Sequence, residues 1–238
     1  MHVDKIASEE RGITQNNWLD SRHTYSFGPY HNLKRINFGT LRVFNDDVIK
    51  PSMGFGTHSH DNMEIITIVL EGQIEHKDST GNHGVIKANE VQRMTAGSGI
   101  QHSEFNPSKN EQVHLLQIWV YPEKRDLEPG YEQKSFNPAD FKNKLFPVVS
   151  HTQSDQAIFI HQDASFFLGA LDAGKSVTHT PKSKKHGDYL FVIEGEVAVE
   201  DKILKTGDSA QITEVGTLEI RAVERSKVLL IEVSVSTL

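Results

Sequence analysis

The chain has 238 residues with 25 basic and 32 acidic side chains, for a formal net charge of −7. Because so acidic a chain has no general attraction for phosphate backbones, we expect no direct nucleic-acid partner. The sequence contains no cysteine, which excludes disulfides, iron–sulfur clusters and thiol nucleophiles and leaves nitrogen and oxygen as the metal ligands. No apolar run approaches the roughly 20 residues needed to span a bilayer, so no membrane association and a soluble, cytoplasmic protein are expected.

Short runs of β-branched and aromatic residues recur along the chain, separated by small, polar, Gly-bearing turns. The expected strands fall at residues 38–44, 65–69, 113–121, 157–161, 189–199, 209–213 and 227–235. Helical signals are sparse: one short piece is expected from Asn137-Pro138 to Lys144, and a second near residues 17–22. Many short strands with little helix predict an all-β fold, a sandwich or a barrel.

An internal repeat divides the chain into two similar halves. The sequence VLEGQI at residues 69–74 matches VIEGEV at residues 192–197, an offset of 123 residues. The segment 122–138 is rich in proline and poor in apolar residues, which is typical of a linker. We therefore expect one β domain over residues 1–133 and another over residues 134–238.

Four residues in the first half have the spacing of a metal site. Side chains two apart on a strand point to the same face, so His58 and His60 can aim at one point, as can His102 and Glu104. If the two strands are neighbours, three imidazoles and one carboxylate converge. The alternative is an exposed histidine pair on one strand and a core histidine on the other.

A site of three histidines and one carboxylate suits a divalent transition metal: iron, manganese, nickel, copper, cobalt or zinc. Six-coordination would leave two positions open, which is typical of a metal that takes part in chemistry. Most other histidines need no function. We expect solvated imidazoles at His2, His31, His76, His83 and His151, which lie in polar or turn-like sequence.

Two segments resemble the two motifs of the cupin superfamily: residues 56–72, which include His58 and His60, and residues 96–106, which include His102 and Glu104. More narrowly, HTYSFG at 23–28, EHKDSTGN at 75–82 and GIQHSE at 99–104 resemble the pirin family. The resemblance implies a bicupin, two tandem β-barrels with one metal in the first. It also implies His58, His60, His102 and Glu104 as ligands and favours iron(II).

The chain departs from the family pattern in two ways. Glu64 stands near the place where the general cupin motif takes its carboxylate, but its spacing is shifted by one residue, so Glu104 is the better ligand. Pirins usually carry proline between the two histidines and an Arg-Gly-Phe-like triplet after them, whereas this chain has Ser59 and Asp61-Asn62-Met63. The four ligands are kept, while the lining of the pocket is altered.

The second half is expected to hold no metal. The repeat offsets place Pro181, Ser183, Ile220 and Ala222 where the first half has its four ligands. His179 and His186 lie nearby, but seven apart in a lysine-rich stretch that we interpret as a solvated loop.

The pirin resemblance implies a dioxygenase that opens quercetin-like flavonols, so the expected partners are a small aromatic substrate and O2, with Glu104 as both ligand and proton acceptor. Some of four apolar residues should line the mouth of the pocket: Met53, Phe55, Met63 and Phe105. The alternatives are a metal-binding adaptor that acts through a protein partner, and a cupin isomerase. A monomer is expected.

Overall fold

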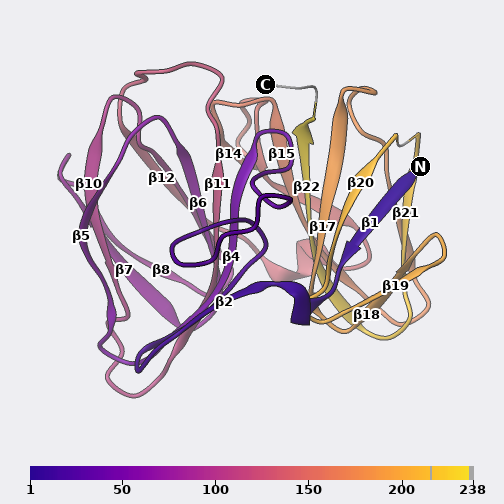
Figure 1. Ribbon diagram of the computed structural model, residues 1–238, viewed down its shortest axis with the longest axis horizontal. Helices are drawn as coiled ribbons and strands as arrows, with labels where there is room; N and C mark the ends of the chain where they lie inside the picture. The colour runs from indigo at the N-terminus through magenta and orange to yellow at the C-terminus, as the bar shows by residue number, and fades with distance from the viewer. Residues whose placement is uncertain (215, 236–238) are drawn as a thin grey trace.

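The computed structural model describes residues 1–214 and 216–235. It is almost entirely β, with two halves side by side (Figure 1), and each half combines one seven-stranded with one four-stranded sheet. The predicted all-β fold of two tandem barrels is thereby confirmed. Across the described ranges, no helix is long and apolar enough to cross a membrane.

The first half is built around a seven-stranded sheet in the order β12-β9-β6-β11-β4-β3-β2. Its strands are β2 (Gly12–Gln15), β3 (Leu19–His23), β4 (Leu41–Ile49), β6 (Glu64–Glu71), β9 (Glu90–Thr95), β11 (Val113–Val120) and β12 (Gly130–Ser135). The facing sheet has the order β5-β10-β7-β8, with β5 (Gly54–His60), β7 (Gln73–Asp78), β8 (His83–Lys87) and β10 (Ile100–Phe105).

The second half repeats this plan with a seven-stranded sheet in the order β1-β20-β17-β22-β15-β13-β14. Its strands are β1 (His2–Ile6), β13 (Leu145–Ser150), β14 (Ile158–Phe159), β15 (Ala164–Leu171), β17 (His186–Glu194), β20 (Ser209–Thr213) and β22 (Ser226–Ser234). The facing sheet has the order β16-β21-β18-β19, with β16 (Ser176–His179), β18 (Glu196–Val199), β19 (Lys202–Lys205) and β21 (Leu218–Ala222).

The two seven-stranded sheets pack against each other, so their central strands are buried on both faces. On β6, Val69 belongs to the core inside the first barrel, while Ile66 and Ile68 belong to the core between the halves. A strand covered on both faces has no polar side, which explains the continuous apolar run of β6. Aromatic rings fill the junction, where Phe44 lies 4.8 Å from both Tyr189 and Phe191 between ring centroids.

The first strand of the chain joins the second barrel. β1 pairs antiparallel with β20, and in Figure 1 this indigo strand lies among the orange and yellow strands. Lys5, on this strand, forms an ion pair of 2.8 Å with Asp208 and so helps to hold β1 against the second barrel. The proposed division between residues 133 and 134 stays a prediction, and it falls within β12, which pairs with β9 of the first half.

The repeated Glu-Gly step has a common structural cause. Gly72 ends the turn between β6 and β7 with φ +74, and Gly195 does the same between β17 and β18 with φ +90. A Cβ at Gly72 would meet the backbone oxygen of Gln112, and one at Gly195 would meet that of Arg225. Both turns therefore require glycine, at positions 123 residues apart.

Both predicted helical pieces differ from the structure. The segment after Asn137 forms only a short 3-10 helix, η2 (Pro138–Phe141), and an unpredicted one, η1 (Ser8–Glu10), follows β1. The expectation for residues 17–22 was wrong, because the Asn16 side chain accepts hydrogen bonds from the backbone of Trp18 and Leu19 and starts β3.

Candidate metal centre

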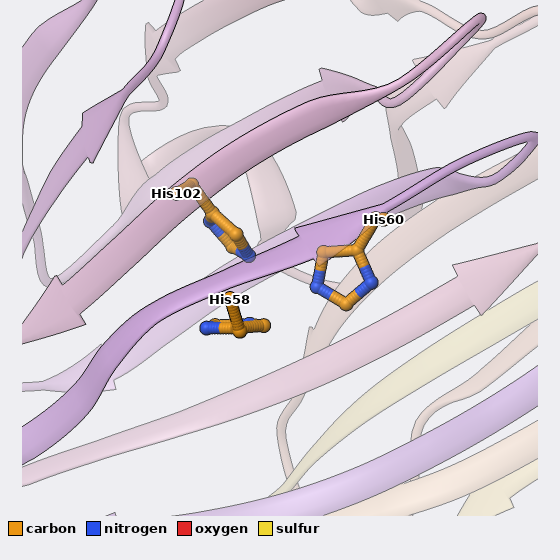
Figure 2. A group of neighbouring side chains, drawn as sticks. All are labelled: His58, His60 and His102. Atoms are coloured by element: carbon orange, nitrogen blue, oxygen red, sulfur yellow. The ribbon is translucent and has the colours of Figure 1, made fainter.

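Three of the four predicted ligands converge from two paired strands. β5 and β10 are antiparallel neighbours in which His58 lies opposite His102. Figure 2 shows the rings of His58 and His60 from β5 facing that of His102 from β10. The ring centroids are 4.4 to 4.9 Å apart, and the three ligand nitrogens lie within 4.8 Å of one another.

Local hydrogen bonds leave one ring nitrogen free on each of His58 and His102. The Nδ1–H of His58 donates to the Gly56 carbonyl at 2.8 Å, which leaves Nε2 without a proton. The Nε2 of His102 is buried and has no hydrogen-bond partner. A buried nitrogen without a partner is costly, and coordination of a cation would satisfy it. This observation fits the residues to a metal ion.

His76 supports His102 from behind. The Nε2–H of His76 donates to Asp78 at 3.1 Å, so its Nδ1 is left to accept from Nδ1 of His102 at 3.4 Å. Such a chain fixes the tautomer that presents Nε2 of His102 to a metal. Although burial raises the pKa of Asp78, hydrogen bonds from Thr80, His76 and Asn82 outweigh it and lower that pKa to about 2.

The prediction that His76 is solvated was wrong, since the residue is fully buried. The alternation of β7 contains the missed signal, because His76 is two residues after buried Ile74 and shares its inward face.

Burial also keeps two of the candidate ligand imidazoles neutral. Desolvation, with the neighbouring histidines, lowers the pKa of His60 to about 4 and that of His102 to about 3. Both rings are therefore unprotonated near neutral pH. Their lone pairs are available to a metal ion without loss of a proton.

Glu104 lies beside the three histidines, but its carboxylate does not group with all three of them. A register shift separates His102 from Glu104 in the pairing with β5, and the Glu104 oxygens group with His76 and His102 instead. The Gln117 amide donates to both carboxylate oxygens, at 3.2 and 3.0 Å. Glu104 lines the same cavity as the three histidines, and its part in ligation stays a prediction.

Glu64 points away from this cavity. Its carboxylate is fully buried and accepts hydrogen bonds from the backbone and ring of His161, at 3.1 and 3.2 Å. His161 belongs to the second half of the chain. The buried Glu64 therefore helps to join the two halves.

The histidines lie in a cavity of about 180 Å³. Its aromatic side is formed by Phe27, Phe55 and Trp119, and its polar side by residues that include Ser21, Asn45, Asp47 and Gln117. Of the four residues predicted for the mouth, Phe55 is in the lining, whereas Met53 and Phe105 are exposed elsewhere and Met63 packs in a neighbouring cluster.

His23 and Phe27, from the pirin-like segment at residues 23–28, also line the cavity. A larger cavity of about 530 Å³ lies between the halves, lined in part by Glu71, His114 and Arg225. The candidate metal ligands all lie in the smaller cavity.

Comparison with known proteins identifies the family. The Pirin family model matches residues 6–120, and a quercetinase C-terminal cupin domain model matches residues 147–233. The quercetin 2,3-dioxygenase of Escherichia coli K12 is 40% identical over 225 residues, which cover 94% of this chain and 96% of that protein. The chain belongs to the pirin family. Another pirin-like protein, from Caulobacter vibrioides, is 35% identical over 97% of this chain and 99% of its own length.

Solved pirin structures have the same architecture. The crystal structure of YhhW from Escherichia coli superposes with a TM-score of 0.94 at 38% identity, and the match covers 100% of both chains. A second structure, of the bacterial pirin YhhW in complex with nickel(II), gives a TM-score of 0.93 at 37% identity and covers 99% of this chain and 100% of that one.

Proposed function

We propose that this pirin is a metal-dependent dioxygenase that opens quercetin-like flavonols with O2. The observation that carries the proposal is the buried, unpartnered Nε2 of His102 facing two further imidazoles in an aromatic-lined cavity. The relative named quercetin 2,3-dioxygenase, at 40% identity over nearly the whole chain, supports the reaction type.

The proposed ligands are His58, His60, His102 and Glu104, with iron(II) as the resident ion. The nickel(II) complex of the E. coli pirin supports a divalent ion. When bound, such an ion acts as a Lewis acid that favours the deprotonated flavonol, the form electron-rich enough to react with O2. All four residues come from one chain, so the site needs no second copy and is compatible with the expected monomer.

The protein groups around the ion orient the acid and accept the proton. Gln117 holds both oxygens of Glu104 and thereby limits rotation of the carboxylate. A carboxylate oxygen of Glu104 accepts the proton of the flavonol 3-hydroxyl as the substrate arrives. The amide of Gln117 stays bonded to the other oxygen during this step.

The size of the cavity restricts which part of the substrate it encloses. At about 180 Å³ it is smaller than the roughly 300 Å³ typical of sites for drug-sized ligands, so it receives the oxygen-bearing ring system near the ion while the rest extends outward. Trp119 lies edge-on to His60 at 4.8 Å and to Phe27 at 5.4 Å, and these rings exclude water from one side.

The test is turnover by protein reloaded with a single metal. The protein is stripped with a chelator, reloaded without oxygen with iron(II), manganese, nickel, cobalt, copper or zinc in turn, and mixed with quercetin and O2. We expect loss of quercetin absorbance coupled to O2 uptake with at least one metal. Glu104→Gln should lower kcat about 100-fold or more, because the proton acceptor is lost.

The matched control is Glu111→Gln, an exposed glutamate outside the cavity, which should leave turnover unchanged. If metal binds stoichiometrically but no metal supports turnover, the dioxygenase proposal is wrong. A role as a metal-binding adaptor for a protein partner would then be favoured.

A further inference from the structure

The second barrel contains a cluster of metal-ligating side chains of its own. His179 lies on β16, Asp188 on β17 and Glu232 on β22, and one donor atom from each lies within 4.8 Å of the other two. The Nε2 of His179 is 3.0 Å from Glu232 Oε2 and 3.4 Å from Asp188 Oδ1. The sequence interpretation of His179 and His186 as a solvated loop was wrong, because His186 is buried and His179 is largely covered.

Asp188 is the residue whose surroundings indicate a bound ligand. Its side chain is 0% exposed, and neither carboxylate oxygen has a hydrogen-bond partner in the described structure. The single Nε2–H of His179 already serves Glu232, so it cannot also satisfy Asp188. The His179 ring that lies 3.4 Å from Asp188 is thus shared with Glu232, and two buried carboxylates that face one imidazole are costly unless a cation balances them.

The spacing of the donor atoms suits a small divalent cation. An ion with ligand bonds of about 2.1 Å holds adjacent donors about 3.0 Å apart in octahedral and about 3.4 Å apart in tetrahedral geometry. The observed separations are 3.0 and 3.4 Å. One imidazole with two carboxylates is a ligand type used for manganese, iron and zinc.

The strand pairing places one residue of this cluster on the equivalent of the first site. His179 lies opposite Leu218 on β21 as His60 lies opposite Ile100 on β10, so His179 stands at the place of His60. Asp188 lies 123 residues after Ile65, and the cross-strand pair of Asp188 with Glu232 corresponds to the pair of Ile65 with Trp119. Ile65 and Trp119 line the cavity of the first barrel. The second barrel thus keeps a histidine at the place of His60, has Val177 and Ile220 at the places of His58 and His102, and has carboxylates where the first barrel has an apolar wall.

A further histidine lies on the same face. His186 is two residues before Asp188 on β17, is buried, and has an Nε2 without a hydrogen-bond partner. That nitrogen is 3.3 Å from Asp163. Lys182 also lies near the cluster: its ammonium pairs with Asp163, and its backbone N–H donates to Glu232 at 2.7 Å.

We propose that His179, Asp188 and Glu232 form a second divalent-cation site. This site does not depend on the proposed dioxygenase function. Without a cation, the alternative is that a protonated His179 alone balances the two carboxylates.

The test counts bound manganese(II) by the electron paramagnetic resonance signal of the free ion. The chelator-stripped chain should bind two ions at micromolar concentration, and His58→Ala, which damages the first site, should keep one. Asp188→Asn and Glu232→Gln should each lose one ion and keep the other. The control is Asp201→Asn, an exposed acid in the same half, which should keep both.

Binding of only one ion by the wild type, with no loss in either carboxylate variant, would overturn the proposal and leave His179 as the counter-charge. If a variant fails to fold, an anomalous difference map of manganese-soaked wild-type crystals decides. A peak between His179 and Asp188 supports the site, and its absence contradicts it.

Discussion

Asp47 should make the stability of this protein depend on pH in an unusual direction. The residue faces the cavity of the first barrel, is 3% exposed, and accepts a hydrogen bond from Ser21. Burial, supported by the negative charges of Asp46 and Glu104, raises the pKa of Asp47 from 3.8 to about 7 despite that hydrogen bond. The perturbation is Asp47→Asn, which keeps the shape of the protonated acid and removes its titration.

The sign follows from proton binding in the two states. Because the folded-state pKa is the higher one, the stabilisation from protonated Asp47 is fully present below about pH 4 and is lost as the pH rises to about 7. At 1.36 kcal/mol per pKa unit, the loss amounts to about 4 kcal/mol as an upper bound. The free energy of unfolding of Asp47→Asn, taken relative to that of the wild type, should therefore rise by up to this amount between pH 4 and pH 8.

The assay is denaturant unfolding of both proteins across that pH range, in the presence of a chelator. Subtracting the two curves cancels the groups that they share. The matched control is Asp46→Asn on the opposite face of β4, where Asp46 contacts Arg11 at 3.2 Å and His114 at 2.6 Å. Burial acts to raise the pKa of Asp46, but these partners outweigh it and lower that pKa, so the stability that ionised Asp46 contributes is fully present above about pH 4 and is lost only at lower pH. Removal of this carboxylate should therefore not produce the gain of about 4 kcal/mol between pH 4 and pH 8 that is expected for Asp47→Asn.

A difference curve for Asp47→Asn that stays flat from pH 4 to pH 8 would refute the reasoning. It would mean that Asp47 is ionised throughout, with water or a hydrogen-bond donor compensating for its burial. A gain of the same size for both variants would also refute it, because the two carboxylates would then share one environment.

Three further results are expected. His76→Ala should weaken metal binding at the first site about 10- to 100-fold in a chelator competition titration, because His102 loses the ring that fixes its tautomer. Gly97→Ala should lower the thermal midpoint, since Gly97 has φ +53 and a Cβ there would collide with a neighbouring backbone oxygen, whereas Gly216→Ala, with open space around it, should not. Phe191→Ala should cost about 3–5 kcal/mol in denaturant unfolding, because this ring fills the junction between the halves, and a loss below about 1 kcal/mol would contradict that packing.

The alternation of inward and outward side chains along single strands could be read from the sequence. It predicted the cluster of His58, His60 and His102 in the first half. The two-residue spacing of His58 and His60 put both rings on one face, and the pairing of β5 with β10 brought His102 to them. The same rule, applied to the run from Ile74 to His76, would have predicted that His76 is buried. Its polar neighbours concealed this.

Features that depend on pairing between distant segments could not be predicted. The sheets of the two barrels have similar edge strands, and nothing in the sequence of residues 2–6 indicates that they pair with β20 of the second barrel. The cluster of His179, Asp188 and Glu232 was hidden for a related reason. A fixed offset of 123 puts Ser183 at the place of His60, whereas the strand pairing puts His179 there. The other two donors come from two further strands and meet His179 only after folding.

The most direct test of the central claim is an anomalous difference map at the iron edge, from crystals loaded with iron(II) without oxygen. The account predicts a peak inside the first barrel, with bonds of about 2.1 Å to nitrogens of His58, His60 and His102 and to an oxygen of Glu104. A first barrel without a peak, or an ion that leaves the Nε2 of His102 uncoordinated, would contradict it.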